Sequence, residues 1–564
     1  MIIGISYYID NAMLNHNVPL LIDTIRTGQS NKMMLILIWL TVLVVAFALY
    51  LKENYSKFKR KGVKGPKPIP VLGTGIGVFF GKEHMTDYMV RMYQTYPNER
   101  FFGQFELTRP VVVIRDIDLI KQITTKDFEY FLDHRSMVEA DIDPLFGRNL
   151  ITLKGQEWKD MRSTLSPAFT SSKIKLMVPF MMEVGNQMTE SLKKKIKESN
   201  VNYIDVDSKD LTTRYANDVI ASCAFGLKVD SMMDEDNEFY KMGKFVTNFT
   251  TLMLVKVLFF IYTPAIMRIL KIKFLPENTS NFFKGLILKT MKDREKNNII
   301  RPDMIHLLMQ SKKGKLAHEE NACTDKDTGF ATVEECNVGM KMDQKDWSDD
   351  DLVAQALLFF LGGFDTVSTA MTFSLHELAL SPEVQDKLLA EIRENEQKNN
   401  GKFDFNSIQK MVYMDMVVSE VLRLWPPAPV LDRICTKDYN IGKANDEATQ
   451  DYIVRKGESV SLAVWAIHRD ANFFPNPLKF DPERFSEENK HNIRPFSYMP
   501  FGLGPRNCIA SRFALCELKV MLYQLLQHFE ISPCEKTCIP SQLEAGKFNL
   551  SLKGGHWIRI KIRE

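Results

Sequence analysis

The chain has 564 residues, of which 45% are hydrophobic and 25% are charged. These proportions are typical of globular proteins and exclude a disordered, collagen-like or polytopic membrane chain. The 73 lysines and arginines nearly balance the 70 aspartates and glutamates, so the overall charge does not indicate a nucleic-acid-binding protein. The eight cysteines include no C-x-x-C pair, which favours a reducing compartment over a disulfide framework.

The N-terminal region contains an uncharged run from Met33 to Leu51. At about 1.5 Å per residue, this run can cross a ~30 Å hydrocarbon layer. A cleaved signal peptide is the alternative, but the run exceeds the usual apolar core and no small-residue cleavage site follows it. We therefore expect an uncleaved transmembrane anchor at 33–51. Residues 1–32 show no clear periodicity and end at the doublet Met33-Met34, so they are a leader or reflect a start assigned too early.

Residues 52–70 are first basic and then rich in proline. Because lysine and arginine are sparse before the anchor and abundant after it, the positive-inside bias predicts that the rest of the chain lies in the cytoplasm. Pro66, Pro68 and Pro70 hold φ at about −65° and favour a stiff hinge, with a plain linker as the alternative.

At roughly 150 residues per domain, the length suggests three to four domains. No second linker is evident, however, so we expect residues 71–564 to form one unit.

Three shorter segments can be assigned next. Val111 to Ile114 is a strand candidate, and Ile117 to Thr124 is predicted to be a short helix. Ser311 to Asp346 is rich in charged residues and glycine, which predicts a surface loop. Its Cys323 and Cys336 have no nearby histidine, so a metal site there is disfavoured.

A long central helix is predicted from Asp351 to Leu380, because these thirty residues contain no proline and follow the cap-like Ser348. Gly362 and Gly363 interrupt its pattern, at a cost of about 1 kcal/mol each relative to alanine. Close packing of another helix would require glycine here, and so would a gap that must stay open for a ligand. Thr366 follows Gly362 by one turn, so the two residues share a face.

Cys508 differs in context from the other cysteines. Two glycines and a proline precede it in Phe501 to Ala510, and a helical pattern begins at Ser511. Such a turn lets backbone N–H groups approach the sulfur, and a helix N-terminus adds partial positive charge, so both favour the thiolate. On its own, a cysteine is more often a small buried apolar residue.

The flanking residues decide between these interpretations. Phe501, Gly504, Arg506 and Cys508 have the spacing of the haem-binding loop of the cytochrome P450 superfamily, and the segment resembles that loop. Other segments resemble the same family in the expected order, and the resemblance extends from about Lys64 to the C-terminus. These segments are the pair Trp158 and Arg162, the E-x-x-R pair Glu420 and Arg423, Arg433, and Arg484 in a later loop.

The resemblance implies a mainly α fold with small β-sheets, in which one large haem domain is built around a long central helix. Cys508 would be the axial thiolate ligand of the haem iron. Asp365 and Thr366 would relay protons to oxygen, and Glu420, Arg423 and Arg484 would form a structural cluster. The haem would contact Trp158, Arg162, Gly362, Arg433, Phe501, Gly504 and Arg506. The substrate would contact Leu358, Leu361, Ala428, Val430 and Leu431.

The function implied by the resemblance is insertion of one oxygen atom of O2 into lipophilic small molecules. Electrons would come from NADPH through NADPH–cytochrome P450 reductase on the endoplasmic reticulum, with cytochrome b5 as an optional second donor, since the chain shows no nicotinamide or flavin fingerprint. Ala510, in place of the usual glycine, and Trp347 to Asp351 resemble an insect branch that oxidises drugs and toxins. Three alternatives remain. They are oxidation of an endogenous lipid or hormone, a reductase-independent haem-thiolate isomerase or dehydratase, and a non-catalytic membrane-tethered haem or ligand-binding protein.

Overall fold

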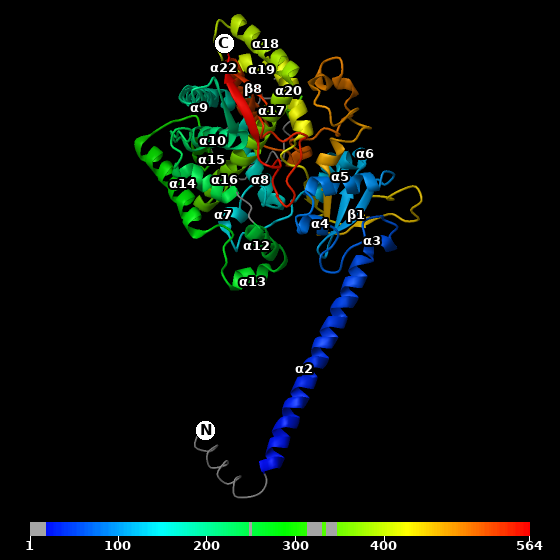
Figure 1. The fold of residues 1–564 in the computed structure, drawn as a ribbon. Helices are drawn as coiled ribbons and strands as arrows, with labels where there is room; N and C mark the ends of the chain where they lie inside the picture. Colours follow the sequence, from blue (N-terminus) through cyan, green and yellow to red (C-terminus); the bar gives the residue numbers. More distant parts are fainter. Residues whose placement is uncertain (1–17, 248–250, 313–329, 334–346, 564) are drawn as a thin grey trace.

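The computed structural model describes residues 18–247, 251–312, 330–333 and 347–563. One long helix, α2 (Val18–Tyr55), projects away from a much larger body that holds all the other described elements (Figure 1). The prediction of a mainly α fold with small β-sheets is confirmed. The predicted loop from Ser311 to Asp346, with Cys323 and Cys336, lies largely outside the described residues, since only 311, 312 and 330–333 belong to them.

Most of the body is helical. Its remaining helices are α3 (Lys57–Arg60), α4 (Ile76–Phe79), α5 (Met85–Thr95), α6 (Ile117–Lys121), α7 (Pro144–Gly147), α8 (Gly155–Leu165), α9 (Ser171–Glu198), α10 (Ser208–Ile220), α11 (Glu238–Thr247), α12 (Thr251–Tyr262), α13 (Pro264–Ile269), α14 (Glu277–Asn297), α15 (Met304–Lys312), α16 (Asp349–Gly362), α17 (Ser368–Leu380), α18 (Pro382–Lys398), α19 (Phe405–Gln409), α20 (Val412–Leu424), α21 (Val464–Ile467) and α22 (Ser511–His528).

Three small sheets complete the described part of the body. The largest has the order β1-β2-β7-β4, with β2 and β7 parallel and the other pairs antiparallel. Its strands are β1 (Phe101–Glu106), β2 (Arg109–Ile114), β7 (Ser459–Leu462) and β4 (Leu431–Ile434). The other two sheets have the orders β3-β9-β8 and β5-β6. Their strands are β3 (Tyr203–Asp207), β9 (Trp557–Ile562), β8 (Phe529–Ser532), β5 (Tyr439–Asn440) and β6 (Ile453–Val454).

The predicted strand at Val111 to Ile114 is the buried part of β2. The predicted helix Ile117 to Thr124 ends earlier as an α-helix, because α6 passes after Lys121 into a π-helical turn, Gln122–Lys126. Asp116 caps α6, since its carboxylate accepts hydrogen bonds from the backbone N–H groups of Asp118 and Leu119.

The long central helix is observed as α16, a π-helical turn η5 (Gly363–Val367) and α17. Ser348 is its N-cap, and the Asp351 side chain bonds back to the Ser348 N–H, which completes a capping box. The π turn falls on the glycine-containing segment, where the sequence departs from helix preference. Turns of this kind often occur at functional sites.

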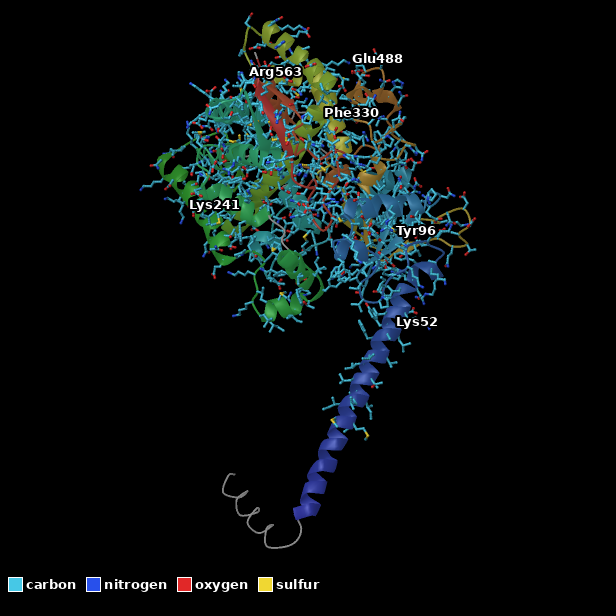
Figure 2. The ribbon with its side chains drawn as sticks, in the orientation of Figure 1. Lys52, Tyr96, Lys241, Phe330, Glu488 and Arg563 are labelled. Carbon is cyan, nitrogen blue, oxygen red and sulfur yellow. The ribbon has the colours of Figure 1, made fainter. Side chains whose placement is uncertain are left out.

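The helix α2 contains the predicted anchor and begins well before Met33. Its described apolar part, from Met33 to Tyr55, is almost entirely exposed and long enough to cross a membrane. Figure 2 shows Lys52 where the helix meets the body. Just beyond, Phe58 is buried against the sheet, and Gly103 N–H donates to the carbonyl oxygen of Lys64 at 2.9 Å. The basic segment is therefore attached to β1 directly.

Candidate active site

The loop before Cys508 depends on glycine at one position. Gly504 has φ +67°, and a Cβ there would lie 1.8 Å from the carbonyl oxygen of Thr124. No other residue fits without moving the backbone. The loop closes on itself, because the N–H of Cys508 donates to the carbonyl oxygen of Phe501 at 2.8 Å. Helix α22 then begins three residues after the cysteine.

The Cys508 thiol faces an internal space. Its side chain is exposed, yet enough protein lies around it that burial raises the pKa of the thiol. The Ala510 N–H and the Arg162 charge oppose this shift but do not outweigh it. The loop N–H therefore favours the thiolate, as expected, but desolvation by the surrounding protein outweighs it. A bound metal cation would reverse the balance, since a coordinating thiol is deprotonated.

Three buried arginines lie near this loop. The guanidinium of Arg506 stacks on Trp158, 3.9 Å from the ring centre, and donates to the carbonyl oxygens of Leu132, Leu150 and Leu153. Burial and the charges of Arg433 and Arg162 lower the pKa of Arg506 to about 9, although Asp133 lies within 3.5 Å. Arginine stays protonated in proteins, so this lowering expresses the electrostatic cost of gathering the cations.

Arg433 is a buried cation. It lies on β4, its exposed fraction is 2%, and burial lowers its pKa to about 10. Its guanidinium donates to two carbonyl oxygens, those of Asp432 and Leu503, and forms no ion pair within the described part of the chain. The neighbouring Asp432 carboxylate instead contacts His134 Nδ1 and the backbone N–H of Arg135.

Trp158 and Arg162 are both buried on α8. The two Arg162 guanidinium nitrogens donate to the carbonyl oxygen and to Oδ1 of Asn507, at 2.8 and 2.6 Å. Arg162 thus holds the residue directly before Cys508, a contact that the sequence did not predict.

These residues fit a haem. A buried cation without a counter-ion needs an anion, and a planar guanidinium suits a carboxylate such as a propionate. The exposed thiol needs a metal cation to become a stable anion. Both requirements are met by one group that carries carboxylates and an iron ion.

The central helix exposes one face in its middle. Between Asp351 and Ala379, a stretch that is described throughout, only Leu358 and residues 361–363, 365 and 366 are not fully buried. Leu361 and Gly362 lie three and four residues after Leu358, and Thr366 lies four after Gly362, so these residues share a face. Since the flanking turns are fully buried, this face also borders an internal space. The turn η5 contacts α22, the helix that follows Cys508.

The surroundings of Gly362 and Gly363 differ. A Cβ on Gly363 would lie 2.6 Å from Cδ1 of Ile220 on α10, so any larger residue there would have to displace the end of that side chain. A Cβ on Gly362 would meet nothing within 4 Å. Packing against α10 therefore applies to Gly363, whereas a gap kept open for a ligand at Gly362 stays a prediction.

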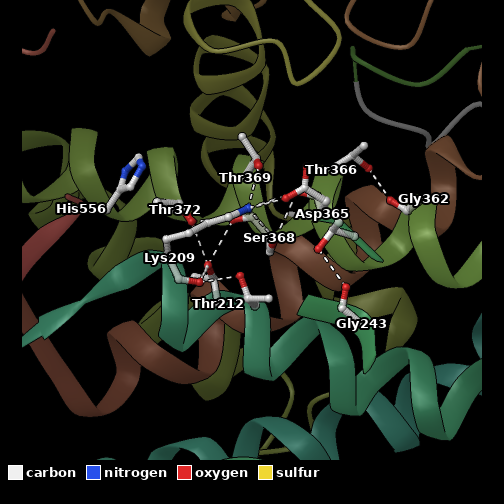
Figure 3. Close-up of polar contacts among 12 residues, drawn as sticks. Lys209, Thr212, Gly243, Gly362, Asp365, Thr366, Ser368, Thr369, Thr372 and His556 are labelled. Atoms are coloured by element: carbon white, nitrogen blue, oxygen red, sulfur yellow. Dashed lines mark hydrogen bonds and ion pairs between the residues drawn. The ribbon is translucent and has the colours of Figure 1, made fainter. Parts of the chain in front are cut away.

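Asp365 and Thr366 are adjacent but have different partners. Thr366 Oγ1 donates to the carbonyl oxygen of Gly362 at 2.5 Å. The Asp365 carboxylate accepts from Lys209 Nζ at 3.0 Å, and the same amine donates to the hydroxyls of Ser368 and Thr369 (Figure 3). The proton relay implied by the resemblance therefore includes an acid that is held by a cation.

Lys209 was missed by the sequence analysis. It lies in the first turn of α10, two residues after the N-cap Asp207, and nothing in its local sequence connects it with Asp365. His556 lies on the other side of it (Figure 3). Burial, aided by the charge of Lys209, lowers the pKa of His556 to about 3, so this histidine is neutral and leaves Asp365 as the counter-ion of Lys209.

Glu420, Arg423 and Arg484 meet in the interior. Arg423 binds the Glu420 carboxylate through two nitrogens, at 2.6 and 2.8 Å, and both side chains are fully buried. Arg484 Nε approaches the same carboxylate at 3.3 Å. Arg423 also donates to the carbonyl oxygens of His468 and Pro477, which fixes the chain that leads to the cysteine loop. The exposed ion pair considered for E-x-x-R is thus not observed.

The segment after α20 leads into β4. Ala428 is exposed, and Val430 and Leu431 are partly exposed. Leu431 and Arg433 share a face of β4 because side chains alternate along a strand. The segment therefore presents apolar side chains on the same side as the unpaired arginine.

Comparison with known proteins agrees with this site. A family model described as Cytochrome P450 matches residues 63–557. Cytochrome P450 9e2 of Blattella germanica is 42% identical over 93% of this chain and 98% of its own length. Probable cytochrome P450 9f2 of Drosophila melanogaster is 42% identical over 92% and 98%, and cytochrome P450 6k1 of Blattella germanica is 36% identical over 92% and 95%. The chain belongs to the cytochrome P450 family and is a monooxygenase.

Proposed function

We propose that this monooxygenase inserts oxygen into lipophilic small molecules, and that xenobiotics such as plant toxins or insecticides are among them. The observation that carries the proposal is the open face of the central helix, where Leu358 and Leu361 flank Gly362 and Thr366. Apolar side chains beside a polar hydroxyl suit an oily substrate held near a proton donor. Ala428, Val430 and Leu431 extend this lining from the segment after α20. The similarity to insect cytochromes P450 supports the assignment to an insect branch.

The haem would be held by residues already described. Cys508 would be the residue that binds its iron, within the loop closed by Phe501 and Gly504. Arg433 and Arg506 would bind the propionates. The Trp158 ring would hold Arg506 in place, because the guanidinium stacks on it. Arg162 would act through Asn507 and fix the cysteine loop. Gly362 would leave space over the haem. When bound, the haem supplies the activation of O2.

The chain supplies proton delivery and substrate position. The Thr366 hydroxyl, now bonded to the Gly362 carbonyl oxygen, would turn to donate its proton into the internal space. After its carboxylate leaves Lys209, Asp365 would take a proton from solvent water and pass it to the Thr366 hydroxyl. The hydroxyls of Ser368 and Thr369 remain bonded to the lysine when it does, so the amine stays in place.

We further propose a domain organisation that matches this role. Residues 33–51 would anchor the chain in the endoplasmic reticulum membrane, 52–70 would be the hinge, and 71–564 would form the catalytic unit on the cytoplasmic face. NADPH–cytochrome P450 reductase would be the electron donor, with cytochrome b5 as an optional second donor. The exposed apolar part of α2 supports the anchor, because an apolar surface of this length is unfavourable in water.

The test is reconstitution with reductase, NADPH and a panel of plant toxins, insecticides and endogenous lipids. We expect oxidation that requires both reductase and NADPH, and turnover without them would favour an isomerase or dehydratase. Preference for an endogenous lipid over every xenobiotic would refute the proposed substrate class. Cys508→Ala should abolish the thiolate-type spectrum of the reduced CO complex, whereas Cys534→Ala, a change at a partly exposed cysteine, should keep it.

A further inference from the structure

The end of α2 is hydrogen-bonded to the turn between β1 and β2. Asn54 Nδ2 donates to the carbonyl oxygen of Thr108 at 2.6 Å, and the Tyr55 hydroxyl donates to that of Leu107 at 3.0 Å. The Tyr55 ring also packs edge-on against Phe105 of β1 at 4.9 Å between ring centres. The long helix therefore has a defined contact with the turn at residues 107 and 108.

The end of α12 is also hydrogen-bonded to the strand residues that flank this turn. Arg109 Nη2 donates to the carbonyl oxygen of Ile261 at 2.6 Å, and its guanidinium lies 4.6 Å over the ring of Tyr262. The Tyr262 hydroxyl donates to the carbonyl oxygen of Glu106 at 2.7 Å. Burial raises the pKa of Tyr262 to about 12, so this hydroxyl keeps its proton at neutral pH. The contacts of Arg109 and Tyr262 run in opposite directions and join the two segments.

The segment α12–α13 needs such a connection. It carries exposed apolar side chains, and Figure 1 shows it on the side of the body from which α2 leaves. Arg268 forms ion pairs with Glu139 and Asp141, which are exposed, and Lys256 Nζ donates to the carbonyl oxygen of Phe274 at 2.9 Å. Exposed pairs contribute little and are screened by salt. The exposed apolar residues are Val255, Phe259, Ile266, Ile269 and Leu270.

We propose that the β1–β2 turn is a clasp that ties α12 to the end of α2, with Arg109 and Tyr262 as its positioning residues. The clasp sets the position of the apolar α12–α13 segment relative to the long apolar helix. A shift of α2 would be passed to α12 through four side-chain bonds to carbonyl oxygens, two on each side. The inference goes beyond the proposed function, since it concerns how two segments are held and not the chemistry.

Hydrogen–deuterium exchange of the full chain in phosphatidylcholine nanodiscs tests the clasp. Tyr262→Phe and Arg109→Ala should each speed exchange of the amides of residues 255–262 by roughly fivefold, the effect expected from losing one hydrogen bond. Asn54→Ala should speed exchange at residues 107–109 and, through the turn, at residues 255–262. Exchange in α9 is the internal reference and should not change.

The chain contains a matched control. The Arg559 guanidinium lies 4.0 Å over the ring of Tyr203, an Arg–Tyr pair of the same kind on a different sheet. Tyr203→Phe should leave residues 255–262 unchanged. Equal exchange in Tyr262→Phe and the parent would overturn the clasp. A response to Tyr262→Phe without any response to Asn54→Ala would overturn the connection to α2. Neither readout needs substrate turnover, so both are independent of the proposed function.

Discussion

The Asp365 carboxylate lies 3.0 Å from the Lys209 amine, whereas the hydroxyl of the next residue, Thr366, donates to the Gly362 carbonyl oxygen. Two adjacent side chains on one helix thus contact different parts of the molecule. The π turn that contains both explains the separation, because it changes the spacing of side chains along the helix. The acid and the alcohol can act together only after the acid leaves the lysine.

Lys209→Met should change how well oxidation is coupled to electron use. Without the amine, the Asp365 carboxylate loses its ion-pair partner, and we expect a smaller fraction of the NADPH consumed to appear as product. The measurement is the ratio of product to NADPH in the reconstituted system. Lys228→Met is the matched control, because Lys228 pairs with Glu183 at 2.8 Å on the surface. An unchanged ratio in Lys209→Met would remove this lysine from proton delivery.

Arg433→Leu should affect the haem-free and haem-loaded proteins in opposite directions. Removing a buried charge that lacks an ion pair should leave the free energy of unfolding of the haem-free chain unchanged or raise it by ~1–4 kcal/mol. Haem affinity should fall roughly tenfold or more, because a charge-assisted bond to a propionate is lost. Urea unfolding and haem titration measure the two effects.

The control for this variant is Arg423→Leu. It leaves the Glu420 carboxylate buried beside Arg484 alone, and it should lower the free energy of unfolding by ~3–5 kcal/mol with or without haem. If Arg433→Leu destabilised the haem-free chain as much as Arg423→Leu does, Arg433 would be part of the packing and not a cofactor ligand.

The adjacent glycines provide an internal comparison. Gly363→Ala places a Cβ 2.6 Å from Ile220, and we expect a loss of ~1–3 kcal/mol of stability from overpacking. The Cβ added in Gly362→Ala meets no neighbour, so helix propensity should raise the free energy of unfolding by about 1 kcal/mol. The same methyl group narrows the internal space and should raise KM for bulky substrates. Thermal unfolding and KM for a series of substrates of increasing size distinguish the two. Equal stability of both variants would contradict the assigned reasons.

Glu377 should make stability fall as the pH rises. Burial raises the pKa of Glu377 from 4.5 to about 7 in the folded chain, although the Trp425 Nε1–H donates to its carboxylate at 2.7 Å. Between these two values the folded chain holds a proton that the unfolded chain has released, so stability decreases with increasing pH across this window. Below about pH 4.5 both states are protonated and the loss is absent.

Glu377→Gln should remove this dependence and keep the bond from Trp425. We expect the variant and the parent to be about equally stable near pH 4.5, and the variant to be more stable above pH 7, by at most about 3 kcal/mol. Urea unfolding at the two pH values gives the comparison. The same difference at both would show that Glu377 ionises as freely in the folded chain as in the unfolded one.

Local features of the chain were predictable because short-range geometry decides them. Ser348 begins the central helix through a capping box that needs only residues three apart. The π turn falls where glycines interrupt the helical pattern. Glu420 and Arg423 face each other because they lie three apart on α20. The left-handed Gly504 belongs to a loop whose spacing alone indicated the family.

Contacts between distant segments were not predictable in this way. Lys209 and Asp365 are far apart in the chain, and so are Arg162 and Asn507, or Gly363 and Ile220. The net direction of the Cys508 pKa shift could not be read from the loop either, because desolvation depends on the whole surrounding body.

The sequence by itself determined the family and the central helix and predicts Cys508 as the reactive cysteine, since each is encoded in short motifs or in the local pattern of residue types. Only the tertiary structure decided that Asp365 pairs with Lys209, that Arg433 forms no ion pair with the described residues, and how α12 is joined to α2. These relationships arise where segments remote in the chain pack together, and burial there sets the strength of every charge and hydrogen bond.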